Sequence, residues 1–258
     1  MPPITTERLF DSFRHWARNQ FHTYRGCIGY VESKNSDGDI GVGTCFHVGD
    51  GVFVTARHVI EGRQEIRIDF DDNSVAMTLI QDSARSSLER PGDVHIIEGP
   101  YFHAEEKVDV ACFRLDFIPE AWIPLGGHLE DYLGQYDLIL NRTLVLGHPP
   151  VPRSDRPVLV ASLGEINALV TRYDAKYIHF IVSSTARGGF SGGPVLIAYN
   201  ELNEKSGTAL LGLVTDSLVR GEVDTESGYM AVLSVDPIYQ CLQTNNMLSA
   251  AQAASLGE

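Results

Sequence analysis

Residues 188–194 are Gly-Gly-Phe-Ser-Gly-Gly-Pro, the strongest chemical motif in the chain. Glycines on both sides of Ser191 let the backbone turn sharply, leave the hydroxyl exposed and let backbone N–H groups converge on a developing oxyanion. A serine hydroxyl is a weak nucleophile unless a nearby base, usually a histidine held by a carboxylate, takes its proton. The motif therefore predicts nucleophilic chemistry at Ser191 that depends on a histidine and an acid elsewhere in the chain.

The positions of the histidines separate two folds that use such a serine. Residues 189–193 also match G-x-S-x-G, the nucleophile motif of α/β-hydrolases, in which the catalytic histidine follows the serine. All nine histidines of this chain precede Ser191. This order excludes the usual α/β-hydrolase triad, and the absence of alternating strand and helix patterns agrees.

His58 and Asp109 are the best candidates for the base and the acid. His58 lies in Val-Thr-Ala-Arg-His-Val-Ile (54–60), just after an expected strand, where a loop can aim it into a cleft. Asp109 lies in the apolar run Val-Asp-Val-Ala-Cys-Phe (108–113), where a buried carboxylate needs a partner such as an imidazole N–H. Asp116 is a weaker rival because it ends its strand. The order histidine, aspartate, serine is that of chymotrypsin-type enzymes.

Short apolar and β-branched runs separated by turn residues fill the chain after Gly26. Such runs, with almost no helical pattern between them, predict an all-β protein. Two sets of about six predict two six-stranded antiparallel barrels, with polar loops at 81–93 and 201–207. The first set is 27–31, 41–48, 52–55, 66–70, 75–80, 94–97 and 108–115, and the second is 138–146, 158–170, 177–182, 194–198, 209–214 and 229–235.

Helical patterns are confined to the two ends of the chain. Thr5 or Thr6 can cap an amphipathic N-terminal helix that we expect to pack on the body of the protein, with membrane or partner docking as the alternative. Asp236 can cap and Pro237 can begin a short C-terminal helix, after which we expect a frayed tail. The predicted units are an N-terminal helix (1–25), a first barrel with His58 and Asp109 (26–120), a second barrel with Ser191 (121–235), and a C-terminal helix and tail (236–258).

Three segments together resemble the trypsin-like serine proteases of the chymotrypsin fold. Residues 55–59 (Thr-Ala-Arg-His-Val) are similar to the family's TAAHC segment, 109–111 (Asp-Val-Ala) to DIAL, and 188–195 to GDSGGP. The segments occur in the family's order, with spacings of 51 and 82 residues between the three candidate side chains. The resemblance covers roughly residues 26–245.

The resemblance implies a serine endopeptidase that works through an acyl-enzyme. Ser191 would be the nucleophile, His58 the general base and then the general acid, and Asp109 the group that orients His58. The backbone N–H groups of Gly189 and Ser191 would form the oxyanion hole. The substrate would be a protein or peptide bound in an extended form.

The family pattern also implies a set of residues around the S1 pocket, which receives the side chain that precedes the cleaved bond. Thr185 would form its floor and supplies no carboxylate there. Asp216, near the mouth, either attracts a basic side chain or is a solvated loop residue. The walls would come from Thr215, Asp216, Ser217 and Gly228.

Two departures from the family pattern bear on control. Phe190 stands where secreted trypsin-like enzymes have the aspartate that binds a new N-terminus after zymogen cleavage. Val59 stands where they have the cysteine of a disulfide beside the catalytic histidine. Both departures resemble the intracellular and bacterial branch of the fold. We hypothesise that a partner protein or ligand controls activity by ordering residues 187–190.

The composition limits the partners and the compartment. A formal net charge of −14 without a basic stripe argues against nucleic-acid binding. The N-terminus has no leader-like pattern, no apolar run is long enough for a membrane span, and the four cysteines lack zinc-ligand spacing. We therefore expect a cytoplasmic protein with reduced cysteines, no membrane partner, and no metal or organic cofactor.

Two alternatives to an active endopeptidase stay open. One is a catalytically silent protease-like module that binds a partner, although such modules usually lose a triad residue and none is lost here. The other is an esterase on the same fold, because a fold does not determine which acyl group is attacked.

Overall fold

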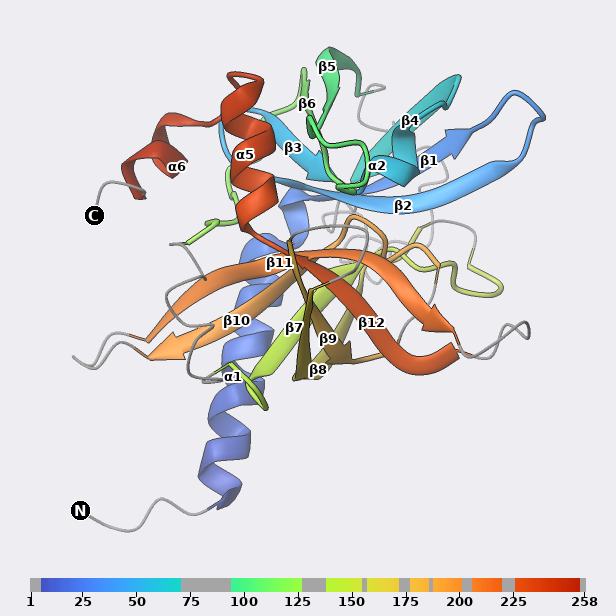
Figure 1. Ribbon diagram of the computed structural model, residues 1–258. Coiled ribbons are helices and arrows are strands. Elements are labelled where there is room, and N and C mark those ends of the chain that lie inside the picture. The colour runs from blue at the N-terminus through green and yellow to red at the C-terminus, as the bar shows by residue number, and fades with distance from the viewer. Residues whose placement is uncertain are drawn as a thin grey trace, which may run out of the picture.

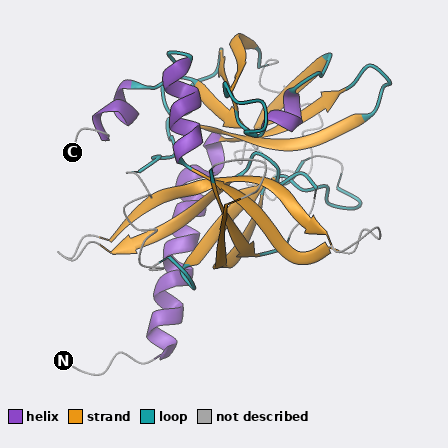
Figure 2. Ribbon diagram, viewed as in Figure 1, coloured by secondary structure: helices purple, strands orange, loops and turns teal. Residues whose placement is uncertain are grey.

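The structure is a computed structural model that describes residues 6–70, 94–126, 138–154, 157–171, 177–185, 188–200, 206–219 and 226–255. Two six-stranded antiparallel sheets form the body, one above the other in Figures 1 and 2. A helix at each end of the chain packs against them. None of the helices within these residues is long and apolar enough to cross a bilayer.

The first sheet has the strand order β4-β1-β2-β3-β6-β5. An isolated bridge between Ile68 and Val94 brings β4 against the chain that leads into β5, so that the two edges of the sheet approach each other. The strands are β1 (Ile28–Lys34), β2 (Ile40–His47), β3 (Val52–Thr55), β4 (Glu65–Phe70), β5 (Ile96–Phe102) and β6 (Ala111–Leu115).

The second sheet is a closed barrel with the order β10-β11-β12-β9-β8-β7. Pairing of β10 with β7, for example Val195 with Val145, closes it. The strands are β7 (Arg142–Gly147), β8 (Val160–Thr171), β9 (Ile178–Ser183), β10 (Pro194–Asn200), β11 (Ser206–Val219) and β12 (Glu226–Ser234). The predicted architecture of two six-stranded antiparallel β-barrels is confirmed.

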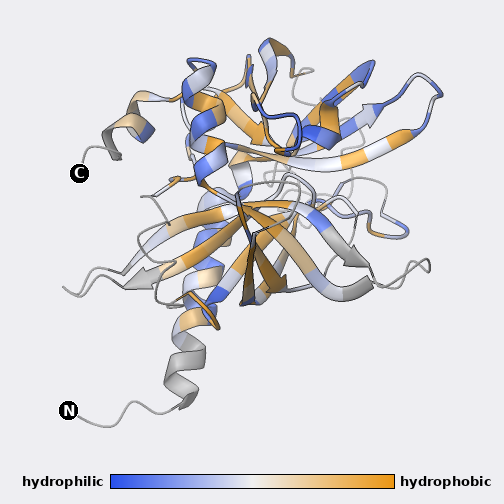
Figure 3. Ribbon diagram, viewed as in Figure 1, coloured by the Kyte–Doolittle hydropathy of each residue, from blue (hydrophilic) through white to orange (hydrophobic). Residues whose placement is uncertain are grey.

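Buried apolar side chains of the strands form the core, and Figure 3 shows that hydrophobic residues occupy much of the strands. In the first sheet the rings of Phe53 and Phe113 stack with their centroids 6.1 Å apart. Phe180 is fully buried in the second sheet. All four cysteines are buried thiols, and Cys112 Sγ of β6 lies 3.7 Å from Cys241 Sγ of the C-terminal helix α5 (Asp236–Thr244). The cysteines therefore act as small core residues.

Several expected boundaries differ from the structure. The run 108–115 becomes a strand only at Ala111, because the N–H of Val108 bonds to the carbonyl of Glu105 and that of Val110 bonds to the carbonyl of Val108. Asp109 therefore lies in a tight loop before β6. The expected strand 75–80, the expected loop 81–93 and residues 201–205 of the second loop lie outside the described residues.

The N-terminal helix α1 (Thr6–Tyr24) packs on the second barrel, as expected. Trp16 Nε1 donates a hydrogen bond to Thr208 Oγ1 of β11 at 3.0 Å. The ring of Phe13 stacks on Trp16 and lies 5.4 Å from the guanidinium of Arg142. Ala17, one helical turn after Phe13, is buried.

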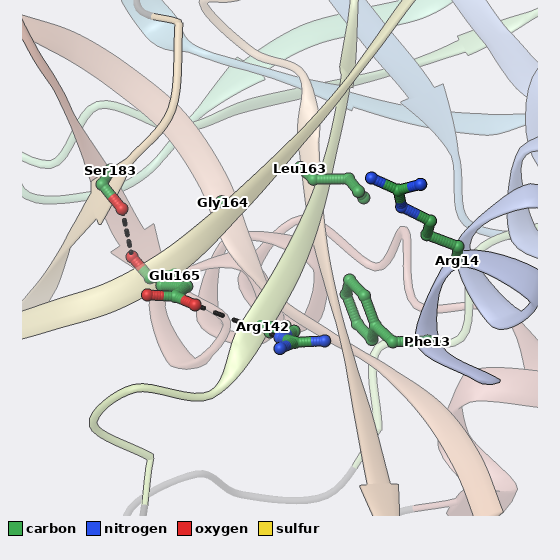
Figure 4. A pocket seen from close by; sticks show the side chains of 7 residues that line it. All are labelled: Phe13, Arg14, Arg142, Leu163, Gly164, Glu165 and Ser183. Carbon is green, nitrogen blue, oxygen red and sulfur yellow. Dashed lines mark hydrogen bonds and ion pairs between the residues drawn. The ribbon is translucent and has the colours of Figure 1, made fainter. Parts of the chain in front are cut away.

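A surface pocket of about 310 Å³ lies where α1 meets the barrel (Figure 4). Arg142 stands between Phe13 and Glu165, with Nε 4.0 Å from Oε1 of the glutamate. The guanidinium therefore has protein partners on both sides, which supports a role in docking α1. The described lining residues are Phe13, Arg14, Arg142, Leu163, Gly164, Glu165 and Ser183.

The C-terminal segment contains two helices, α5 (Asp236–Thr244) and α6 (Ala250–Ser255). The residue in the cap position of α5 is Val235, so the expected cap at Asp236 is wrong by one residue. Asp236 and Pro237 instead occupy the first turn, where an acidic group and a proline both suit a helix start.

The expectation of a frayed tail is wrong for residues 250–255. Gln252 is 1% exposed, and its side-chain amide donates to the carbonyls of Val48 (3.0 Å) and Ile123 (2.8 Å). Its side-chain oxygen accepts the N–H of Leu125 at 3.1 Å. These bonds anchor α6 to the first sheet and to the segment that follows it.

We predict that Gln252→Ala lowers the free energy of unfolding by about 1–3 kcal/mol, because it leaves buried backbone groups without partners. Urea denaturation monitored by fluorescence measures this change. Gln243→Ala, on the exposed side of α5, is the matched control and should change stability by less than about 0.5 kcal/mol. Equal stability of the two variants would contradict the anchoring role.

Candidate active site

His58 lies in a one-turn helix directly after β3. The strand ends at Thr55, Ala56 is extended, and α2 (Arg57–Ile60) follows. Val59 and Ile60 are buried and hold the turn against the first sheet, whereas the side chain of His58 is 49% exposed. The sequence predicts a loop here, whereas the structure has a short helix, which also exposes the imidazole.

Asp109 holds His58 at two points. One carboxylate oxygen accepts the backbone N–H of His58 at 2.9 Å, and the other lies 2.7 Å from Nδ1. An ionised carboxylate only accepts hydrogen bonds, so Nδ1 must carry the proton and Nε2 is left as the basic nitrogen. The two contacts thus determine both the orientation of the ring and its tautomer.

Arg57 anchors the loop that presents Asp109. Its guanidinium donates to the carbonyls of His103 (3.4 Å), Glu105 (3.3 Å) and Glu106 (2.9 Å), and it lies 4.9 Å from the centre of the Phe102 ring. The sequence places Arg57 next to His58 but gives no sign of this role, because the loop residues that Arg57 binds lie 46 to 49 positions away in the chain.

Opposing influences act on the pKa of His58. Desolvation is the largest and lowers the pKa. The hydrogen bond and charge of Asp109, together with the charge of Asp216, outweigh it, although the charge of Arg63 acts in the opposite sense. The net result is a pKa above the ordinary value, so the site stabilises the imidazolium form.

The turn that contains Ser191 packs directly against the residues that precede His58. Ser191 accepts the N–H of Thr44 on its backbone carbonyl at 2.8 Å. A Cβ at Gly192 would lie 2.2 Å from the carbonyl oxygen of Thr44 and 2.8 Å from the nitrogen of Ala56, closer than real atoms approach. The structure therefore places the Ser191 turn beside the chain segment that leads into His58, where the two sheets meet.

The backbone of this turn directs its carbonyls into the protein. The carbonyls of Gly189, Phe190 and Ser191 accept hydrogen bonds from Thr44 Oγ1 (2.7 Å), Gly193 N (2.8 Å) and Thr44 N. Within the described part of the chain, no hydrogen bond uses the N–H of Gly189 or Ser191. C=O and N–H point in opposite directions across a trans peptide, so the N–H of Ser191 points away from Gly193.

Phe190 anchors the same turn through apolar packing. Its side chain is 2% exposed and lies against the end of β7, where a Cβ on Gly147 would approach Phe190 Cδ1 to 2.6 Å. A buried carboxylate at this position would need a cationic partner. The turn is thus held by packing where secreted trypsin-like enzymes are expected to use an ion pair.

The S1 candidates lie on or directly after three neighbouring strands, β9, β12 and β11. The N–H of Ser184 donates to the carbonyl of Gly228 at 3.2 Å, which places the exposed Thr185 beside this glycine. Thr215 is buried, and its hydroxyl donates across the sheet to Ala231 at 3.3 Å. In the strand register, Asp216 opposes Ala231 and Ser217 opposes Met230.

Other polar candidates are structural or lie outside the described residues. His47 is buried between the carbonyl of Ala121 and the N–H of Gly51. Asp116 accepts the N–H of His95 rather than approaching His58. Arg187 falls outside the described residues. Among the residues that are described, His, Cys, Asp and Glu side chains form no group of three suited to a metal ion.

His148 is buried behind the Ser191 turn. It is 1% exposed, and its Nδ1 has no hydrogen-bond partner among the described residues. Desolvation lowers its pKa to about 4. Its backbone N–H donates to Thr44 Oγ1 at 2.9 Å, so this histidine forms part of the wall behind the turn.

The comparisons with known proteins identify the family and agree with the fold. Residues 43–202 match the family model described as a trypsin-like peptidase domain, and the chain belongs to that family. No curated protein matches the chain.

Solved structures show the same fold at low sequence identity. The active form of the Rv3671c protease of M. tuberculosis has a TM-score of 0.57 at 15% identity, covering 87% of this chain and 82% of its own. The HtrA-type protease AlgWS227A with a tripeptide has 0.61 at 14%, covering 92% and 64%. The serine endoprotease of Yersinia pestis has 0.57 at 15%, covering 91% and 67%.

We predict that His148 makes the protein less stable in mild acid. Because its folded pKa lies below the ordinary value of about 6.5, the unfolded chain binds a proton that the folded chain does not between about pH 6.5 and pH 4. Stability therefore rises with pH across this window, and His148 should account for a loss of about 2 kcal/mol between pH 7 and pH 5.

Urea denaturation at both pH values tests this prediction. His148→Phe keeps a ring beside Tyr30 and should remove most of the His148 contribution. His15→Gln, at an exposed position on α1, is the control and should retain the wild-type difference. An unchanged pH dependence in His148→Phe would contradict the assignment.

Proposed function

We propose that this trypsin-like peptidase is an active serine endopeptidase with Ser191, His58 and Asp109 as its catalytic triad. The observation that carries the proposal is the double contact of Asp109 with His58, made directly beside the Ser191 turn. A carboxylate that both orients an imidazole and determines its tautomer is the arrangement that nucleophilic catalysis by serine requires.

In the proposed reaction, Ser191 Oγ attacks the carbonyl carbon of the peptide bond while His58 Nε2 takes the hydroxyl proton. Asp109 stabilises the imidazolium that forms, in line with the raised pKa of His58. The proton then passes to the leaving amine, the C–N bond breaks and an acyl-enzyme remains. Water, activated by His58, hydrolyses this ester and restores the serine.

The N–H groups of Gly189 and Ser191 are proposed as the oxyanion hole. The carbonyls of the turn are engaged by the protein, whereas these two N–H groups are not used within the described residues. Donors that are already oriented toward the developing charge need no reorganisation during the reaction. Losing one such donor costs about 10²–10³-fold in rate in comparable enzymes.

Substrate is proposed to bind at the ends of β9, β11 and β12, beside Thr185 and Gly228. Because the Thr215 hydroxyl is bonded within the sheet, this residue would contribute backbone rather than a polar side chain to the S1 wall. Asp216 acts electrostatically on His58, which supports a place near the reacting groups. It would favour a basic substrate side chain there.

Control by a partner protein or ligand, rather than by zymogen cleavage, remains part of the proposal. It is supported by Phe190, whose apolar side chain is packed inside the protein where the zymogen switch needs a carboxylate. A newly formed N-terminal ammonium group would find no countercharge at this position.

Labelling with a fluorophosphonate probe tests the triad. We expect labelling of the wild type and its loss in Ser191→Ala and His58→Ala, because the probe reacts only with an activated serine. Ser36→Ala, in the loop after β1, is the control and should label normally. No labelling of the folded wild type, either alone or with candidate partners present, would favour a silent binding module, and labelling without cleavage of any peptide in a library would favour an esterase.

Asp109→Asn tests the coupling between the carboxylate and the imidazole. We expect the labelling rate to fall by about 10³–10⁴-fold, because the favoured tautomer is lost. In the wild type, the rate should rise with pH through a midpoint above the ordinary histidine value of about 6.5, since only neutral His58 accepts the proton.

The pH profile of the residual Asp109→Asn activity should show a lower midpoint, because the contributions of Asp109 that raise the pKa are gone. Asp116→Asn is the matched control and should keep both the rate and the midpoint. A midpoint that does not move in Asp109→Asn would argue against direct coupling of this carboxylate to the base.

A further inference from the structure

Thr44 connects three parts of the molecule through one buried hydroxyl and its backbone. Oγ1 accepts the N–H of His148 at 2.9 Å and donates to the carbonyl of Gly189 at 2.7 Å. Its backbone N–H donates to the carbonyl of Ser191 at 2.8 Å. The residue lies in the middle of β2 and is fully buried, so none of these bonds competes with solvent.

We propose that Thr44 is a positioning residue for the oxyanion hole: its hydroxyl holds the carbonyl of the Gly189–Phe190 peptide, which lies between the two peptides that carry the proposed donors, the N–H groups of Gly189 and Ser191. This inference rests on the proposed function. It assigns to Thr44 a role that the resemblance does not cover.

The need for such a restraint follows from the glycines of the turn. Gly189 has φ +94° and no side chain, so its own conformational preferences restrain the adjoining peptides only weakly. His148 and Pro149 line one side, where a Cβ on Gly189 would lie 2.5 Å from the carbonyl oxygen of His148. The hydrogen bond from Thr44 Oγ1 then fixes the direction of the Gly189 carbonyl.

The chemistry of the position calls for a hydroxyl. The side chain must accept from one backbone N–H and donate to one backbone carbonyl inside a buried site. A hydroxyl provides both functions on a single atom, whereas valine has the same shape and provides neither. Serine retains the hydroxyl and lacks only a methyl group.

Thr44 also connects the Ser191 turn to the chain segment that leads into His58. Its backbone carbonyl accepts a hydrogen bond from Thr55 Oγ1 at 2.7 Å, and Thr55 ends the strand that leads into the helix of His58. One residue of the first sheet thus fixes the nucleophile turn of the second sheet relative to His58. Displacements of about 1 Å at such a site cost up to about 10²-fold in rate.

The test compares the second-order rate of fluorophosphonate labelling in wild type, Thr44→Val and Thr44→Ser. In this reaction the Ser191 oxygen forms a bond to phosphorus, fluoride leaves and His58 takes the proton, while the phosphoryl oxygen occupies the oxyanion hole. We expect a fall of about 10–100-fold in Thr44→Val and recovery to within about threefold of wild type in Thr44→Ser.

Rates are expressed per folded molecule, measured from the unfolding transition, so that a loss of stability alone does not lower them. The pH midpoint of labelling should stay at the wild-type value in all three proteins, because the contacts between His58 and Asp109 are unchanged. Thr44→Ala serves as a second hydroxyl-free variant if Thr44→Val does not fold.

Ser249→Ala is the matched control. The Ser249 hydroxyl is also buried, donates to one carbonyl (Val48, 3.2 Å) and accepts one backbone N–H (Gln252, 3.2 Å), but these bonds anchor α6. This variant should lose stability and keep the wild-type labelling rate.

The outcomes separate the inference from the function on which it rests. A wild-type rate in a folded hydroxyl-free variant, or failure of Thr44→Ser to recover the rate, would overturn the role of Thr44 and leave the endopeptidase proposal intact. A shifted pH midpoint in Thr44→Val would also overturn it, since the fault would then lie at His58. A wild-type protein that does not label, either alone or with candidate partners present, would overturn both.

Discussion

The backbone of residues 188–193 lies so close to both sheets that several of its positions leave no space for a side chain. A Cβ at Gly189, Gly192 or Gly193 would come within 2.5 Å of a backbone oxygen, which no rotamer change can relieve. The neighbours that impose this limit come from β2, from the end of β7 and from the segment after it. The shape of the turn therefore depends on how the two sheets meet.

This contact explains why the candidate site exists only in the assembled molecule. The first sheet contributes His58 and Asp109, which are already bonded to each other within that sheet. The second sheet contributes Ser191 on a turn that is hydrogen-bonded both to Thr44 of the first sheet and to Val214 of the second. At another point of the first sheet, Gln252 of α6 joins the end of β2 to the segment that leads out of the sheet.

Features that a short stretch of sequence determines could be predicted. Contacts between residues that lie far apart in the chain could not. The strands follow apolar runs of the right length, and the triad candidates lie in compact motifs whose order is informative. Thr44, Arg57 and Gln252 carry no such signal, because their partners lie 145, about 48 and up to 204 residues away. Likewise, β6 starts three residues later than its apolar pattern suggests, since backbone bonds around Asp109 form a loop that hydrophobicity does not encode.

The replacement of a charged anchor by Phe190 changes what can regulate the turn. An ion pair between a buried carboxylate and a free N-terminus responds to proteolysis, because cleavage creates one of the two charges. Apolar packing of a side chain that is 2% exposed, together with the hydroxyl of Thr44, involves no group created by cleavage. Anchors of this kind form when the chain folds. A regulator would therefore have to act by binding to the turn or by displacing it. That requirement is the physical basis for proposing control by a bound partner.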